Sequence, residues 1–154
     1  MALLVKARSL KRTDGFTLVE IMLVLMVTAL IAAIAVPVLL RARHNANETT
    51  AVENMRTLSS SLESFRSAQT PAAYPADLSV LSSTDPIYID SVLSSGSKQG
   101  YNFTYTLIGR NQYTLLAAPQ VSGITGTRSF FTDQNGVIRV SPSGIADSSS
   151  TPLD

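Results

Sequence analysis

One carboxylate, Glu20, stands at the start of the most apolar stretch of this chain, four residues after Phe16 in the segment Gly15-Phe16-Thr17-Leu18-Val19-Glu20. Residues 21–40 contain no charged side chain. At about 1.5 Å per residue, a helix of that length crosses a bilayer. An acid at mid-bilayer costs about 2.5–3.5 kcal/mol, and less near an end of the membrane segment. The chemistry expected of Glu20 is therefore pairing with a cation.

Cutting the chain between Gly15 and Phe16 would create that cation. In the uncut chain, the Phe16 nitrogen belongs to an uncharged amide, whereas cleavage produces an α-amine that is mostly protonated at neutral pH. In a low-dielectric bundle the amine and the Glu20 carboxylate attract each other, and either group alone carries a desolvation cost. We therefore predict that cleavage triggers the assembly of copies of the chain.

The residues leave open where the partner of Glu20 lies. Residues 16 and 20 are one helical turn apart, so the pair can form within one chain or between two. A third interpretation is that Glu20 only favours the positive end of its own helix dipole.

Basic residues flank the apolar run unevenly, four before it and two after it: Lys6, Arg8, Lys11, Arg12, and then Arg41 and Arg43. Basic segments stay on the cytoplasmic side of a membrane. We expect the N-terminus inside and the C-terminal part outside.

These features together resemble a type IV prepilin, the precursor family shared by type IV pili and the pseudopili of type II secretion. The resemblance is carried by a basic leader, Gly15 before the cut, Phe16 as the new first residue, Glu20 as the fifth mature residue, and Pro37 inside the apolar helix. It implies cleavage by a prepilin peptidase between Gly15 and Phe16 and methylation of the Phe16 amine. It also implies that Glu20 of one subunit meets the Phe16 amine of a neighbour.

The same resemblance implies an α+β type IV pilin-like fold, in which a long N-terminal helix packs on a C-terminal antiparallel sheet of about four strands. The implied partners are copies of the chain itself, the peptidase, an inner-membrane assembly platform with its ATPase, and membrane lipid before assembly. The precursor is expected in the bacterial inner membrane and the homopolymer as an extracellular or periplasmic filament.

Two other ways of processing compete with this interpretation. Ala33-Ile34-Ala35 is a small-x-small triplet of the kind cut by ordinary signal peptidase, which would release a secreted protein starting at Val36. Against it, the apolar run continues to Leu40. The other alternative is an uncleaved membrane anchor.

Behind the membrane segment, apolar residues recur at helical spacing and predict an amphipathic continuation of the helix. The stripe consists of Val52, Met55, Leu58, Leu62 and Phe65. Five charged residues are expected on the opposite, solvated or subunit-facing side: Glu48, Glu53, Arg56, Glu63 and Arg66. One helix from Phe16 to Ala68 is expected.

The predicted organisation has six parts: a cleaved leader at 1–15, a transmembrane or filament-core helix at 16–40, an amphipathic helix at 41–69, a connecting region at 70–100, an antiparallel meander at 101–142 and a mobile tail at 143–154. Within the helix, Pro37 removes one hydrogen bond and clashes with the carbonyl of Ala33. It predicts a helix break, either the stretch that unwinds in type IV pili or a mild kink.

The composition argues against several classes of function and site. Removing the leader takes away four basic residues and one acid, so the formal charge falls from +1 to −2, and neither value favours nucleic-acid binding. The chain has no cysteine, which excludes disulfides and thiolate metal sites and differs from many type IVa pilins. The only histidine, His44, has no nucleophile or acid pair beside it in the sequence, so no enzyme activity is expected.

Residues 133–136 contain the oxygen ligands that begin a calcium loop, but no glutamate follows at the required distance. A tight hairpin turn is the favoured interpretation, so no cofactor is expected, with calcium as the alternative. The function predicted from the sequence is a structural subunit of a pilus-like filament. The alternative is a minor, adhesive tip subunit acting as a binding module.

Overall fold

The computed structural model describes residues 15–153, so the predicted leader, apart from Gly15, lies outside the described residues, as does Asp154. The chain forms two compact units, one ending at Val38 and one beginning at Leu39. Each unit is described below by itself.

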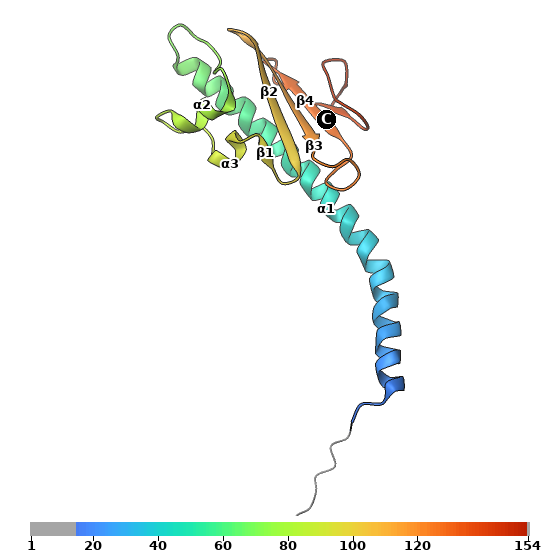
Figure 1. Cartoon of the computed structure of the whole chain (residues 1–154). Helices are drawn as coiled ribbons and strands as arrows, with labels where there is room; N and C mark the ends of the chain where they lie inside the picture. Colours follow the sequence, from blue (N-terminus) through green and yellow to red (C-terminus); the bar gives the residue numbers. More distant parts are fainter. Residues whose placement is uncertain (1–14, 154) are drawn as a thin grey trace, which may run out of the picture. The chain divides into compact units, whose positions relative to one another are not determined.

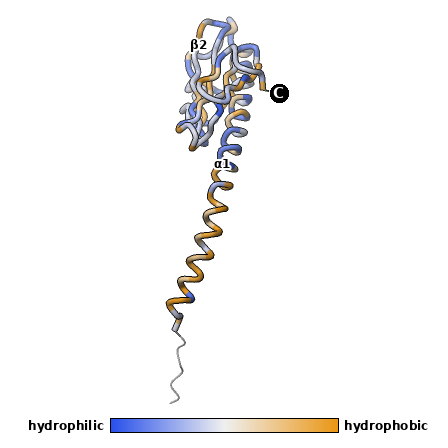
Figure 2. Tube along the Cα trace, turned by 90° about the vertical axis from the view of Figure 1, so that its right-hand side faces the viewer, coloured by the Kyte–Doolittle hydropathy of each residue, from blue (hydrophilic) through white to orange (hydrophobic). Residues whose placement is uncertain are grey.

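Helix α1 runs from Leu18 to Ala68, two residues shorter at its start than expected from the sequence. Part of it belongs to each unit. The portion in the first unit is apolar, as Figure 2 shows by colour, and its side chains are exposed all round. The helix ends before Pro71, and a residue that precedes proline disfavours helical backbone.

Two short helices follow in the second unit, α2 (Leu78–Ser83) and α3 (Ser91–Ser94). Each begins at an aspartate whose side chain caps it: Asp77 accepts from the Ser79 amide at 2.8 Å, and Asp90 accepts from the Leu93 amide at 2.6 Å. The region expected to be an irregular connector is therefore more regular than the sequence indicates, because aspartate N-caps stabilise even single helical turns.

The sheet is antiparallel, as predicted, but it has six strands in sequential order instead of about four. The strands are β1 (Ser97–Lys98), β2 (Tyr101–Gly109), β3 (Gln112–Pro119), β4 (Ser129–Asp133), β5 (Arg139–Ser141) and β6 (Thr151–Pro152). The two additional strands, β1 and β6, are the edges. Each has only two residues, too few to show the alternation by which a strand is recognised in sequence.

The second part of α1 lies against one face of this sheet (Figure 1). Its predicted apolar stripe is confirmed, because Met55, Leu58 and Leu62 are fully buried and Phe65 nearly so, while Val52 packs at the margin of the core. The sheet contributes a set of large buried side chains to the same core: Tyr101, Phe103, Tyr113, Leu115 and Phe130. The α+β fold class expected from the sequence is confirmed.

The structure differs from the prediction of a mobile tail at 143–154. The Ser129 hydroxyl donates to the Gly144 carbonyl at 2.7 Å and accepts from the Ala146 amide at 2.8 Å. Ala146 is buried, and the Leu153 amide donates to the Ile138 carbonyl at 2.8 Å. These contacts hold a serine-rich segment that has only a few apolar side chains from which packing could be inferred.

Candidate functional site

The predicted processing site lies in exposed, non-helical backbone just before α1. Gly15, Phe16 and Thr17 are all exposed, and a Cβ placed on Gly15 would meet nothing within 4 Å. The peptide bond between Gly15 and Phe16 thus lies outside the hydrogen-bonded helix that follows. A peptidase could bind such a segment without first unwinding a helix.

Glu20 is the third residue of α1 and contacts Thr17, the residue just before the helix. The Glu20 amide donates to the Thr17 hydroxyl at 3.2 Å, and the Thr17 amide donates to Glu20 Oε2 at 3.4 Å. This reciprocal pair is a capping box, in which two amides left without helical partners are satisfied by each other's side chains. The Thr-x-x-Glu spacing is the sequence signal for this contact, which was not predicted for Thr17.

The capping contact shows what Glu20 does in the uncut chain. Among the described residues, its hydrogen bonds are both with Thr17. A carboxylate offers about four acceptor positions, so this contact leaves capacity for a cation that arrives later. The interpretation as a helix-end carboxylate and the interpretation as a charge partner are therefore compatible.

The helix behind Glu20 exposes a continuous apolar surface. Large apolar side chains from Leu18 to Leu40 are between 46% and 75% exposed. Soluble monomers rarely expose apolar patches of more than a few hundred Å², so this surface needs lipid or other protein to cover it. By length and composition α1 can cross a membrane.

Residues 10–36 match the prokaryotic N-terminal methylation motif. The chain carries the signal of a type IV prepilin-like precursor. The matched segment of this prepilin-like chain includes Gly15, Phe16 and Glu20 and most of the apolar run, which confirms the resemblance drawn from the sequence. Neither the comparison with curated proteins nor that with solved structures found a match.

Pro37 of the prepilin-like chain lies just beyond the matched segment. Helical structure continues through it without interruption from Leu18 to Ala68. Local melting at Pro37 is therefore absent from the unassembled chain, and unwinding within a filament stays a prediction.

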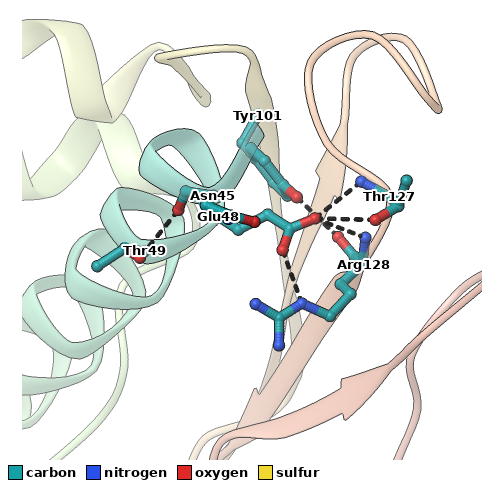
Figure 3. A network of polar contacts seen from close by, with 6 residues as sticks. All are labelled: Asn45, Glu48, Thr49, Tyr101, Thr127 and Arg128. Atoms are coloured by element: carbon teal, nitrogen blue, oxygen red, sulfur yellow. Dashed lines mark hydrogen bonds and ion pairs between the residues drawn. The ribbon is translucent and has the colours of Figure 1, made fainter. Parts of the chain in front are cut away.

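A second polar site, shown in Figure 3, joins α1 to the sheet within the second unit. Glu48 Oε1 accepts from the Thr127 amide at 2.9 Å, the Thr127 hydroxyl at 3.1 Å and the Arg128 amide at 3.2 Å. Glu48 Oε2 accepts from Arg128 Nε at 2.7 Å. Four donors thus converge on one carboxylate.

The assignment of Glu48 to a solvated face is wrong. Its exposure is only 3%, because it precedes Met55 by seven residues and so lies on the same side of the helix as the apolar stripe. Glu53 and Arg56 do lie on an exposed face. Extending the stripe by one heptad would have revealed the burial of Glu48, although its partners at 127 and 128 are too distant in sequence to infer.

Burial raises the pKa of Glu48, but the hydrogen bonds from Thr127 and Arg128 outweigh this effect and hold the pKa below its ordinary value of 4.5. The carboxylate is therefore ionised at neutral pH. Because half-exposed Arg128 supplies the countercharge, the buried charge is paired and hydrogen-bonded, as burial requires.

Further contacts hold the loop between β3 and β4, residues 120–128, against α1 and the start of β2. Asn47 Nδ2 donates to the Thr125 carbonyl at 2.9 Å, and the Tyr101 hydroxyl donates to the Arg128 carbonyl at 2.8 Å. Gly126 is required here, because a Cβ at this position would lie 2.2 Å from the Tyr101 hydroxyl.

Two candidates from the sequence remain, His44 and the turn at residues 133–136. His44 is half-exposed on α1. At residues 133–136, the Asn135 amide donates to Asp133 Oδ1 at 2.9 Å and the Gly136 amide to the Asp133 carbonyl at 3.0 Å, with Gly136 at φ +74°. The turn expected there is confirmed, and calcium binding stays a prediction.

Proposed function

We propose that this chain is a structural subunit of a helical type IV pilus-like filament, assembled after a prepilin peptidase cuts between Gly15 and Phe16. One observation carries the proposal: a lone carboxylate lies at the start of an exposed apolar helix, inside the segment that matches the N-terminal methylation motif. In a filament, the apolar surfaces of neighbouring helices would cover one another. The proposed role is structural and uses no catalytic group.

In this proposal the methylated Phe16 amine of one subunit pairs with Glu20 of its neighbour. Methylation retains the charge, so the pair stays ionic. The capping box supports the arrangement, because Thr17 orients the Glu20 side chain toward the N-terminal end of α1. That end is where a new amine appears.

The proposed sequence of events begins in the bacterial inner membrane, where the apolar helix is covered by lipid. After cleavage and methylation, an assembly platform driven by its ATPase adds the subunit to a homopolymer. The filament is either a surface pilus or the pseudopilus of a type II secretion system.

Intact mass and N-terminal sequencing of the native protein test the processing step. The expected mature protein starts at methylated Phe16. A start at Val36 would support release as a secreted protein, and a start at Met1 would support an uncleaved anchor, so either would contradict the proposal.

The Glu20→Gln variant tests the charge pair. We expect normal cleavage but loss of filaments, because glutamine has a similar size and cannot pair with an amine as an ion. Glu53→Gln, which neutralises an exposed carboxylate on the same helix, is the matched control and should assemble normally. Filaments of normal yield from Glu20→Gln would overturn the assigned role of Glu20.

Electron microscopy and a secretion assay on cells lacking the chain separate the two filament types. Loss of surface fibres with normal secretion indicates a pilus. Loss of secreted proteins with fibres intact indicates a pseudopilus.

A further inference from the structure

A groove lies between α1 and strand β4, within the unit that begins at Leu39. It has a volume of about 230 Å³, and its apolar lining consists of Val52 on α1, Phe130 on β4 and Leu153, which follows β6. One water occupies about 30 Å³ of liquid water, so the groove is large enough to admit an aliphatic side chain. We call it the α1–β4 groove.

Two arginines, Arg56 and Arg128, also line the α1–β4 groove. Arg128 donates through Nε to Glu48 at 2.7 Å, and Figure 3 shows its two terminal nitrogens pointing away from that carboxylate. Among the residues that the structure describes, neither terminal nitrogen has a hydrogen-bond or ion-pair partner. Glu53 on the rim offsets one positive charge, so the groove attracts an acid through the orientation of Arg128 and not through net charge. A guanidinium held in this way can bind a carboxylate with two parallel N–H groups.

The loop between α2 and α3, residues 84–90, presents an acid and an aliphatic side chain two residues apart. Asp85 is exposed and forms no ion pair with a described residue, and Ile87 is 71% exposed. The residues that follow are fixed to the domain: the Tyr88 amide donates to the Leu81 carbonyl at 2.9 Å, and Ile89 is buried. Ile87 is therefore held outward on anchored backbone, so less conformational entropy is lost when it binds.

The groove and the α2–α3 loop lie toward opposite edges of the sheet. Helix α3 follows the loop and leads directly into β1, whereas Leu153 of the groove comes directly after β6. Strands β1 and β6 are the two edge strands, and Figure 1 shows α2 and α3 beside one edge and the C-terminus toward the other. One copy cannot bring the two surfaces together. A contact between them joins different surfaces of two copies, and such a heterologous contact repeats into a helical filament unless it closes into a ring.

We propose that the α1–β4 groove binds the α2–α3 loop of a second copy of this chain. Ile87 enters the groove between Val52 and Leu153. Asp85 pairs with the terminal nitrogens of Arg128. This inference rests on the proposed filament, for which it supplies a contact between sheet domains. One side chain and one ion pair make a small interface, so the contact is weak between isolated domains and forms where assembly holds the domains close together.

Cross-linking tests this contact cleanly, because the chain contains no cysteine and every thiol is an introduced one. Ile87→Cys and Leu153→Cys are produced as separate full-length chains in the same cells, and whole cells are treated with a short bis-maleimide. We expect several-fold more dimer from the mixture than from either variant alone, because a heterologous contact places residue 87 against residue 153 and not against itself. A chain that carries both substitutions should give a ladder of multimers.

Two further variants provide the controls. Ile108→Cys replaces Ile87→Cys in the matched control, because Ile108 is 62% exposed and lies in neither surface. Its mixture with Leu153→Cys should give several-fold less dimer. Asp85→Arg, added to the Ile87→Cys chain, should also reduce the dimer several-fold, because two like charges would then meet at Arg128.

The outcomes separate the contact from the filament. If the native chain forms filaments but the 87/153 mixture gives no more dimer than the 108/153 mixture, the contact is wrong and the filament proposal stands. If 87/153 dimers form while the native chain makes no filaments, the contact holds and the filament proposal fails. Absence of both overturns both. Cross-linking of Leu153→Cys to a different protein instead of to Ile87→Cys would give the groove another occupant, which also overturns the inference.

Discussion

At the scale of single residues, two glutamates on the same helix have different roles. Glu20 caps the start of α1 in exposed surroundings, and Glu48 is buried under four donors. In the proposed function, the first pairs with an amine that cleavage creates. The second has its partners within the folded domain, so its effect should be on stability alone.

We predict that Glu48→Gln lowers the free energy of unfolding by about 1–3 kcal/mol, the usual cost of leaving buried polar groups incompletely satisfied. Glutamine retains one carbonyl oxygen, but its NH₂ group would face the Thr127 and Arg128 donors or the guanidinium. Urea unfolding of the detergent-solubilised chain measures the effect. Glu53→Gln should change stability by no more than about 0.5 kcal/mol, as expected for an exposed site, and equal effects of the two variants would contradict the assigned role of Glu48.

The pH dependence of this contribution follows from the lowered pKa of Glu48. Because the folded-state pKa lies below the ordinary value of 4.5, the stabilisation is fully present above that value and is lost as the pH falls through the folded-state pKa. The stability difference between the native chain and Glu48→Gln should therefore be constant near neutrality and shrink below about pH 4.5. Thermal unfolding at a series of pH values checks this, and a difference that grows on acidification would contradict it.

At the scale of elements, segments with a local sequence signal are predictable, and segments that depend on pairing with distant residues are not. The prediction of the helical stripe from Val52 to Phe65 and of the turn at 133–136 is confirmed, because each has a local sequence signal. Strands β1 and β6 and the packed segment around Ala146 depend on backbone pairing with distant residues, which leaves little trace in the composition. The capping box at Thr17 and Glu20 is local, and its spacing was visible in the sequence.

The close approach at the start of β2 gives a prediction for the 120–128 loop. Gly126→Ala should lower the free energy of unfolding by about 1–3 kcal/mol, the cost of overpacking, because its Cβ would overlap the buried Tyr101 ring. Gly109→Ala is the control, since a Cβ there meets nothing within 4 Å. Urea unfolding compares the two variants. A Gly126→Ala protein as stable as Gly109→Ala would contradict the prediction, because it would show that the loop accommodates the added Cβ without loss of stability.

At the scale of the whole molecule, the residues that form the folded core differ from those to which we assign assembly. The described hydrophobic core is formed by residues from Ala51 onward, all within the unit that begins at Leu39. The apolar run before it contributes no buried side chain among those described. The fold of the sheet domain should therefore not depend on the membrane segment.

A chain consisting of residues 41–154 should then fold by itself. We expect a monomer that is soluble without detergent and unfolds in one cooperative transition, with a free energy of unfolding of about 5–15 kcal/mol, as is usual for domains of this size. Analytical ultracentrifugation and urea unfolding measure both properties, and aggregation or gradual unfolding would show that the membrane helix is needed for the fold. In this fragment Glu48→Gln should destabilise as much as in the full chain. In the full chain Glu20→Gln should leave the unfolding midpoint unchanged, because the Glu20 carboxylate contacts Thr17 and nothing in the core, while the proposed filament assembly is lost.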